Sequence, residues 1–199
     1  PAAAEYIRRK RLAETWRELD SSASLPAEAR RETEAPSLEA RIGKILSGHK
    51  WTLSVAESCT GGLISHRITN VPGSSEYFIG GVVAYVYSAK VALLGVRWET
   101  LQRFGAVSSE TVLEMASGAR KLFKTDFALS VSCIAGPGGA TPNKPVGTSW
   151  VGLASIGRMW SRHFLLSGDR AANKDMLAQL ALEKLLQFIS VGIPGGETP

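Results

Sequence analysis

One stretch of the chain, residues 51–68, restricts the possible folds more than any other. It opens with an apolar run from Trp51 to Ala56, which is typical of a short buried strand. A polar break and two glycines, Gly61 and Gly62, come next, and apolar side chains then recur at helical spacing. Because a strand that passes through a tight turn into a helix is the building unit of α/β sheets, we expect an α/β fold.

The pattern continues along the rest of the chain. Strand-like runs are predicted over 77–87, 126–135, 147–156 and 159–166, and helices over 88–94, 100–104, 109–123 and 169–189. Ser37 is predicted to cap an earlier helix that Gly48 ends. Only Gly157 and Arg158 separate the last two strands, which predicts a hairpin and at least one antiparallel strand. Helices that alternate with strands predict a mixed sheet with helices on both faces.

Three regions differ in composition. Residues 1–36 hold seven Lys or Arg and seven Asp or Glu, and we interpret them as a charged arm, loosely ordered or partly helical, that could instead dock on the domain or on a partner. Residues 37–190 form the predicted domain. Residues 191–199 are rich in glycine and proline and are expected to be a flexible tail.

Composition argues against several kinds of function. No apolar run is long enough to span a membrane, and His49, His66 and His163 show no metal-ligand spacing, so neither a membrane span nor a metal is expected. Cys59 and Cys133 are interpreted as reduced thiols of a cytoplasmic protein, with targeting to an organelle left open because the chain starts at Pro1. The net charge of +5 suits a small anionic substrate, and nucleic-acid binding is not favoured because no such motif occurs.

Ser58 is the candidate nucleophile. It follows a predicted strand and precedes a helix N-terminus, and ligands of open α/β sheets bind at that edge. The alternative is that Ser58 and Thr60 only cap the helix.

Lys90 is the candidate base, since a lysine half-buried against apolar walls loses part of its preference for the charged form. The alternative is an ordinary surface lysine. Arg170 stands where a helix N-terminus disfavours a cation, which makes it a candidate ligand for a phosphate or carboxylate. The loop 136–145 is glycine-rich, and its N–H groups, Thr141 and Lys144 could cradle a phosphate, although it could also be a plain connection.

Several separated segments together resemble the C-terminal domain of the CinA (competence/damage-inducible) family. The resemblance covers about residues 37–190. The segments are Ala56-Glu57-Ser58-Cys59-Thr60-Gly61-Gly62, Gly80 to Tyr85 followed by Lys90 and Leu93-Leu94-Gly95-Val96, Gly105-Ala106-Val107-Ser108, Ile134 to Gly139, and Lys144 to Thr148.

The resemblance implies a three-layer α/β/α domain with a mixed, mostly parallel five-stranded sheet. It also implies an amidohydrolase that converts nicotinamide mononucleotide to nicotinate mononucleotide and ammonia through a serine–lysine dyad, without metal or cofactor, in a homodimer. Ser58 and Lys90 fall on the dyad, Tyr85 on an assisting tyrosine, and Arg170 on an arginine near the phosphate. The remaining expected substrate-binding residues are Glu57, Thr60, Gly61, Ser132, Gly136, Gly138, Gly139 and Thr141.

The chain departs from the family pattern at two places. Val86-Tyr87 replaces the usual Ser-Asn, and Ser132-Cys133 replaces Thr-Gly. Both departures lie at strand ends that are expected to face the pocket, where Cys133 adds a side chain. The alternative is therefore a catalytically silent member that binds a nucleotide or a partner protein.

Overall fold

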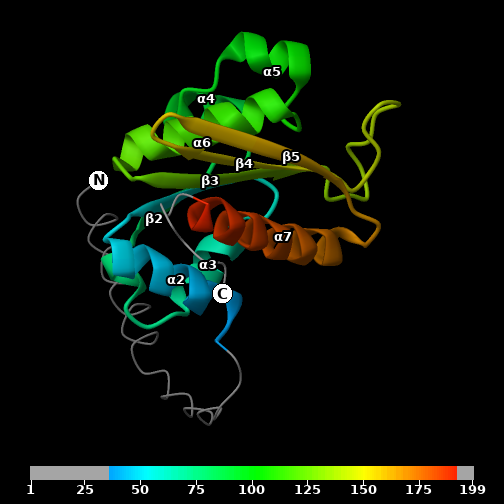
Figure 1. The fold of residues 1–199 in the computed structure, drawn as a ribbon. Coiled ribbons are helices and arrows are strands. Elements are labelled where there is room, and N and C mark those ends of the chain that lie inside the picture. The colour runs from blue at the N-terminus through cyan, green and yellow to red at the C-terminus, as the bar shows by residue number, and fades with distance from the viewer. Residues whose placement is uncertain (1–35, 192–199) are drawn as a thin grey trace, which may run out of the picture. The chain divides into compact units, whose positions relative to one another are not determined.

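The structure, a computed structural model, describes residues 36–191 (Figure 1). The predictions for the arm up to Ala35 and for the tail from residue 192 onward lie outside the described residues. The elements in chain order are α2 (Leu38–His49), β1 (Leu53–Glu57), α3 (Leu63–Thr69), the short 3₁₀ turn η1 (Ser74–Glu76), β2 (Phe78–Val83), α4 (Tyr87–Leu94), α5 (Trp98–Phe104), α6 (Ser109–Phe123), β3 (Phe127–Cys133), β4 (Thr148–Ser155), β5 (Arg158–Leu165) and α7 (Arg170–Ser190).

The five strands form one mixed sheet in the order β2-β1-β3-β4-β5. β1 pairs in parallel with β2 and β3, whereas β4 pairs antiparallel with β3 and β5. Four of the five strands therefore run in the same direction. Helices α4, α5 and α6 lie on one side of the sheet, with α5 outermost, and α2, α3 and α7 lie on the other (Figure 1). The predicted three-layer α/β/α fold is confirmed.

The two faces of the sheet differ in side-chain size. On the α7 side, Val55 and Leu129 pack into a large apolar core. On the α6 side the strands present small residues such as Ala56 and Ala128. A Cβ added at Gly152 would lie 2.6 Å from the carbonyl oxygen of Val112, so α6 packs closely on this face because the strands carry small side chains there.

Several predicted boundaries were wrong, and α5, for example, starts at Trp98 and β3 ends at Cys133. The run 77–87 is not one strand, because β2 ends at Val83, opposite the last residue of β1, and Tyr87 already begins α4. The first helix continues past Gly48 to His49, and Lys50 caps it with a left-handed φ of 56°. The hairpin turn consists of Ile156 and Gly157, since Arg158 already pairs with Ser155.

The long helix α6 was predicted correctly. It spans Ser109–Phe123, and the Ser108 hydroxyl accepts a hydrogen bond from the backbone N–H of Thr111, as a helix N-cap does.

Candidate active site

Ser58 is the first residue beyond β1, at the edge of the sheet where the parallel strands β2, β1 and β3 all end. It is buried, with 7% of its surface exposed. The backbone N–H of Gly61 donates to the Ser58 carbonyl at 3.2 Å and closes the turn. The N–H groups of Cys59 and Thr60 donate to no acceptor within residues 36–191.

Lys90 lies on α4, thirty-two positions after Ser58, and the fold brings the two side chains into contact. Its Nζ is 2.9 Å from the Ser58 Oγ. The same nitrogen donates to the carbonyl oxygens of Ala84 at 2.7 Å and Tyr85 at 3.0 Å. Lys90 is fully buried, as is Leu94 one helical turn later, so α4 turns this face inward. The reading of Lys90 as a surface lysine was wrong.

Burial lowers the pKa of Lys90 from 10.5 to about 8, because the charged form loses its hydration. The contacts around Nζ suit either protonation state. An ammonium donates to Ser58 and to both carbonyls. A neutral amine keeps both carbonyls with its two N–H groups, and its lone pair can then accept the Ser58 hydroxyl proton.

Arg170, the first residue of α7, lines a pocket whose lining includes neither Ser58 nor Lys90. One guanidinium nitrogen donates to the Gly136 carbonyl at 2.7 Å and another to the Tyr85 hydroxyl at 2.8 Å. Tyr85 therefore connects the two parts of the site, since its backbone carbonyl holds Lys90 and its hydroxyl holds Arg170. The pocket has a volume of about 610 Å³ and is lined by Ala135, Gly136, Pro137, Val146, Gly168, Asp169, Arg170 and Ala171.

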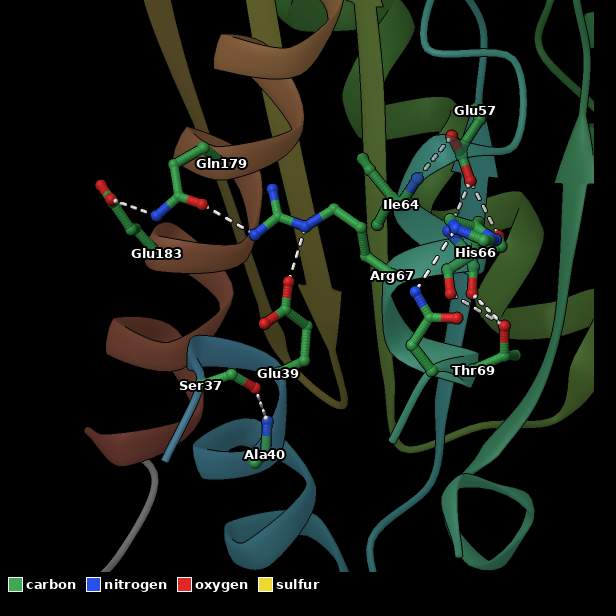
Figure 2. Close-up of polar contacts among 12 residues, drawn as sticks. Ser37, Glu39, Ala40, Glu57, Ile64, His66, Arg67, Thr69, Gln179 and Glu183 are labelled. Carbon is green, nitrogen blue, oxygen red and sulfur yellow. Dashed lines mark hydrogen bonds and ion pairs between the residues drawn. The ribbon is translucent and has the colours of Figure 1, made fainter. Parts of the chain in front are cut away.

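Glu57 and Thr60 hydrogen-bond to each other instead of lining this pocket. The Thr60 hydroxyl donates to the Glu57 carboxylate at 2.7 Å, and both residues are buried. The carboxylate also accepts from the N–H groups at the start of α3, as the line to Ile64 in Figure 2 shows. Gly61 is exposed in the turn between β1 and α3, with a φ of +66° that suits glycine.

The other expected substrate-binding residues are dispersed. Of the loop glycines, only Gly136 lines the pocket, whereas Gly138, Gly139 and Thr141 are exposed farther along the loop. Ser132 is buried in β3 opposite Trp150.

The Lys144 amine is bonded to the protein backbone and is not directed toward a phosphate site in the loop. Its Nζ donates to the backbone carbonyls of Phe104 and Val107. This contact ties the glycine-rich loop to the connection between α5 and α6.

The departures Val86 and Tyr87 lie outside the pocket lining. Val86 caps α4 and is largely exposed. The Tyr87 ring lies against Trp98 in an edge-on arrangement, and its hydroxyl accepts from the Ala106 N–H at 3.3 Å. Tyr87 therefore packs toward α5, and neither residue lines this pocket, contrary to the expectation.

The two cysteines form a disulfide, contrary to the expectation of reduced thiols. Cys59 follows β1 and Cys133 ends β3, and these strands are parallel neighbours. Their ends therefore coincide, and the Cα atoms are 5.7 Å apart, within the range that a disulfide spans. Cys133 takes no part in lining the pocket.

Two kinds of contact were not predicted from the sequence. The carbonyls of Ala84 and Tyr85 hold Lys90, and Gly168, Asp169 and Ala171 line the pocket beside the predicted Arg170. The sequence signal for the Lys90 contacts was a lysine in the first turn of a helix that follows a strand. Nothing in the sequence places 168–171 opposite Gly136.

Within residues 36–191 there is no group of three or more His, Cys, Asp or Glu side chains that could hold a metal ion. Nor does that part of the chain contain a helix with the length and apolar character needed to cross a bilayer.

Sequence comparison identifies relatives of this domain. A family model described as the CinA C-terminal domain matches residues 35–189. A CinA-like protein of Desulfosudis oleivorans is 50% identical over 150 residues, which are 75% of this chain and 36% of that protein. A CinA-like protein of Salinibacter ruber is 45% identical over 155 residues, 78% of this chain and 38% of that protein. The chain thus spans little more than a third of the length of the curated relatives it matches.

Solved structures match over nearly their whole length. A CinA superfamily protein from Klebsiella pneumoniae has a TM-score of 0.75 at 31% identity, covering 77% of this chain and 96% of that one. The competence/damage inducible protein CihA from Agrobacterium tumefaciens has a TM-score of 0.74 at 38% identity, covering 75% and 92%.

Proposed function

Because this chain belongs to the CinA C-terminal domain family, we propose that it is a serine–lysine amidohydrolase that converts nicotinamide mononucleotide to nicotinate mononucleotide and ammonia. The observation that carries the proposal is the 2.9 Å contact between the Ser58 Oγ and a fully buried Lys90 amine. A serine hydroxyl is a weak nucleophile until a neighbouring base accepts its proton. Lys90 is a competent base because its pKa of about 8 leaves a useful neutral fraction near neutral pH.

The reaction then has two halves. Neutral Lys90 accepts the Ser58 proton while the Ser58 oxygen attacks the carboxamide carbon. The N–H groups of Cys59 and Thr60, which have no acceptor within residues 36–191, are candidate donors to the resulting oxyanion, where one donor contributes about 3–4 kcal/mol in other enzymes. Protonated Lys90 returns the proton to the departing ammonia, and a water molecule, activated by the same amine, hydrolyses the acyl-enzyme.

A pocket that Arg170 lines, and that Tyr85 links to Lys90, supports a mononucleotide as the substrate. Its volume of about 610 Å³ is in the range of small-molecule sites. The guanidinium of Arg170 lies at this pocket and offers a charge to a phosphate, which guanidinium groups bind well. The net charge of +5 also favours an anionic substrate.

Ammonia release from nicotinamide mononucleotide tests the proposal. Wild type should release ammonia, and Ser58→Ala should lower the rate by at least about 10³-fold, because it removes the nucleophile. Ser54→Ala is the matched control, since Ser54 is a buried serine on the same strand whose hydroxyl pairs with Thr125, remote from Lys90. It should retain turnover.

Two results would contradict the proposal. Undiminished turnover by Ser58→Ala would exclude the dyad. Wild-type protein that binds nicotinamide mononucleotide but releases no ammonia would instead support the catalytically silent alternative.

A further inference from the structure

Glu57 presents a carboxylate that is completely buried and yet fully hydrogen-bonded. One oxygen accepts from the Thr60 hydroxyl at 2.7 Å, the Gly62 N–H at 3.0 Å and the Ile64 N–H at 3.1 Å. The other accepts from the N–H and the hydroxyl of Ser65, at 2.9 and 2.8 Å. All five donors therefore come from the turn and the first residues of α3, and both oxygens are occupied.

Within the described part of the chain, Glu57 has no ion-pair partner, since the two ion pairs there involve Glu39 and Glu114. Its charge is balanced by N–H groups at the start of α3, where the helix dipole favours an anion. Removing the charge would leave backbone donors without an acceptor, because an N–H group cannot reverse its role.

The far end of α3 is also held in place. Arg67 donates to Glu39 of α2 at 2.6 Å and to Gln179 of α7 at 2.7 Å (Figure 2). These contacts of Arg67 fix α3 against α2 and α7. Because the Glu57 carboxylate is bonded to the first turn of α3, it holds the turn 58–61 in place relative to that helix.

Ser58 lies in the turn that joins Glu57, at the end of β1, to α3. Glu57 is the last residue of β1, and its carbonyl accepts from the Ala84 N–H at 2.8 Å. The Ala84 carbonyl in turn accepts from Lys90. One residue thus joins the backbone next to Ser58 both to the segment that holds Lys90 and, through its side chain, to α3.

We propose that Glu57 is the positioning residue of the Ser58–Lys90 pair, holding the Ser58 oxygen within reach of the Lys90 nitrogen. It acts through the turn 58–61 and touches no reacting atom. The inference rests on the proposed function for its effect on turnover, but the placement of Ser58 can be measured without it.

Glu57→Gln is the decisive variant, because it preserves size and turns one carboxylate oxygen into an NH₂ group that faces backbone donors. We expect kcat for nicotinamide mononucleotide to fall about 10²-fold with KM changed less than about threefold, since misplacing a reacting group by about 1 Å costs that much. Glu57→Asp retains the charge on a shorter arm and should recover part of the kcat.

The matched control is Asp126→Asn. Asp126 accepts from the N–H and the hydroxyl of Thr52, at 2.8 Å each, just before the other end of β1. The control therefore removes a carboxylate that accepts hydrogen bonds next to the opposite end of β1, without touching the Ser58 turn. It should lower the melting temperature while leaving kcat unchanged, whereas a merely structural Glu57 would make the two variants behave alike.

A second readout does not need the substrate. A fluorophosphonate probe, whose fluoride the serine oxygen displaces, should label Ser58 in wild type and in Asp126→Asn, and at least about tenfold more slowly in Glu57→Gln. Slow labelling of the variant supports the inference even if wild type releases no ammonia, which would refute only the proposed function. Equal labelling and equal kcat in wild type and Glu57→Gln would overturn the inference, as would a wild-type Ser58 that the probe does not label. If Glu57→Gln does not fold, the same comparisons apply to Glu57→Asp.

Discussion

Raising the pH from 6 to 9 is expected to increase kcat/KM for nicotinamide mononucleotide about 90-fold, because Lys90 must be neutral to accept the Ser58 proton. With a pKa of about 8, the neutral fraction is about 1% at pH 6, 9% at pH 7 and 91% at pH 9. With the ordinary value of 10.5 it would be only about 0.03% at pH 7. Burial of Lys90 thus accounts for a factor of about 300 in active enzyme near neutral pH.

The assay is the initial rate of ammonia release at substrate concentrations well below KM, because kcat/KM reports ionisations of the free enzyme. The logarithm of kcat/KM should rise by about one per pH unit below 8 and level off above 9. A slope that continues to pH 10 would refute the lowered pKa, and a flat profile from pH 6 to 9 would refute Lys90 as the base. Asp126→Asn is a suitable control and should give the wild-type profile.

Three further predictions follow from the same contacts. Lys90→Met should abolish turnover and flatten the pH dependence of stability. In wild type the pKa of Lys90 is lower in the folded than in the unfolded chain, so the free energy of unfolding should rise by up to about 3 kcal/mol from pH 8 to 10.5. Urea titrations of both proteins would measure this difference. Arg170→Ala should raise KM for the mononucleotide about 10- to 100-fold, because a charge-assisted contact to the phosphate is lost, with kcat changed much less; an unchanged KM in steady-state assays would contradict this role. Reducing the Cys59–Cys133 disulfide, which joins residues 74 positions apart, should lower the free energy of unfolding by up to about 4 kcal/mol. An equal urea midpoint with and without reductant would argue against that bond.

Much of the architecture could be predicted from local patterns. The limits of α6 follow from its Ser108 cap and its apolar spacing, and both are properties of neighbouring residues. The prediction of one strand over 77–87 was wrong because β-branched and aromatic residues continue past the point where β1 ends and no longer offers a pairing partner. Strand length in a sheet depends on the neighbouring strand, which the local sequence does not contain.

The candidate site divides in the same way. Ser58 could be singled out because a strand, a turn and a helix start are all visible within a few positions. The burial of Lys90 could not be predicted, because it arises from tertiary packing, and its partners at Ala84 and Tyr85 are backbone carbonyls of ordinary residues. Cysteine pairing was missed for a related reason, since only the parallel neighbours β1 and β3 bring Cys59 and Cys133 together.

By itself, the sequence determined the order of strands and helices and the chemical groups that stand at strand ends, because those depend on periodicity and on caps within one segment. Only the tertiary structure decided which groups meet: a serine and a buried amine from different segments, an arginine from the last helix against the loop after β3, and a glutamate turned inward to hold α3. The physical reason is that burial and proximity, which set the pKa of Lys90 and the shape of the pocket, arise from residues that lie far apart in the chain.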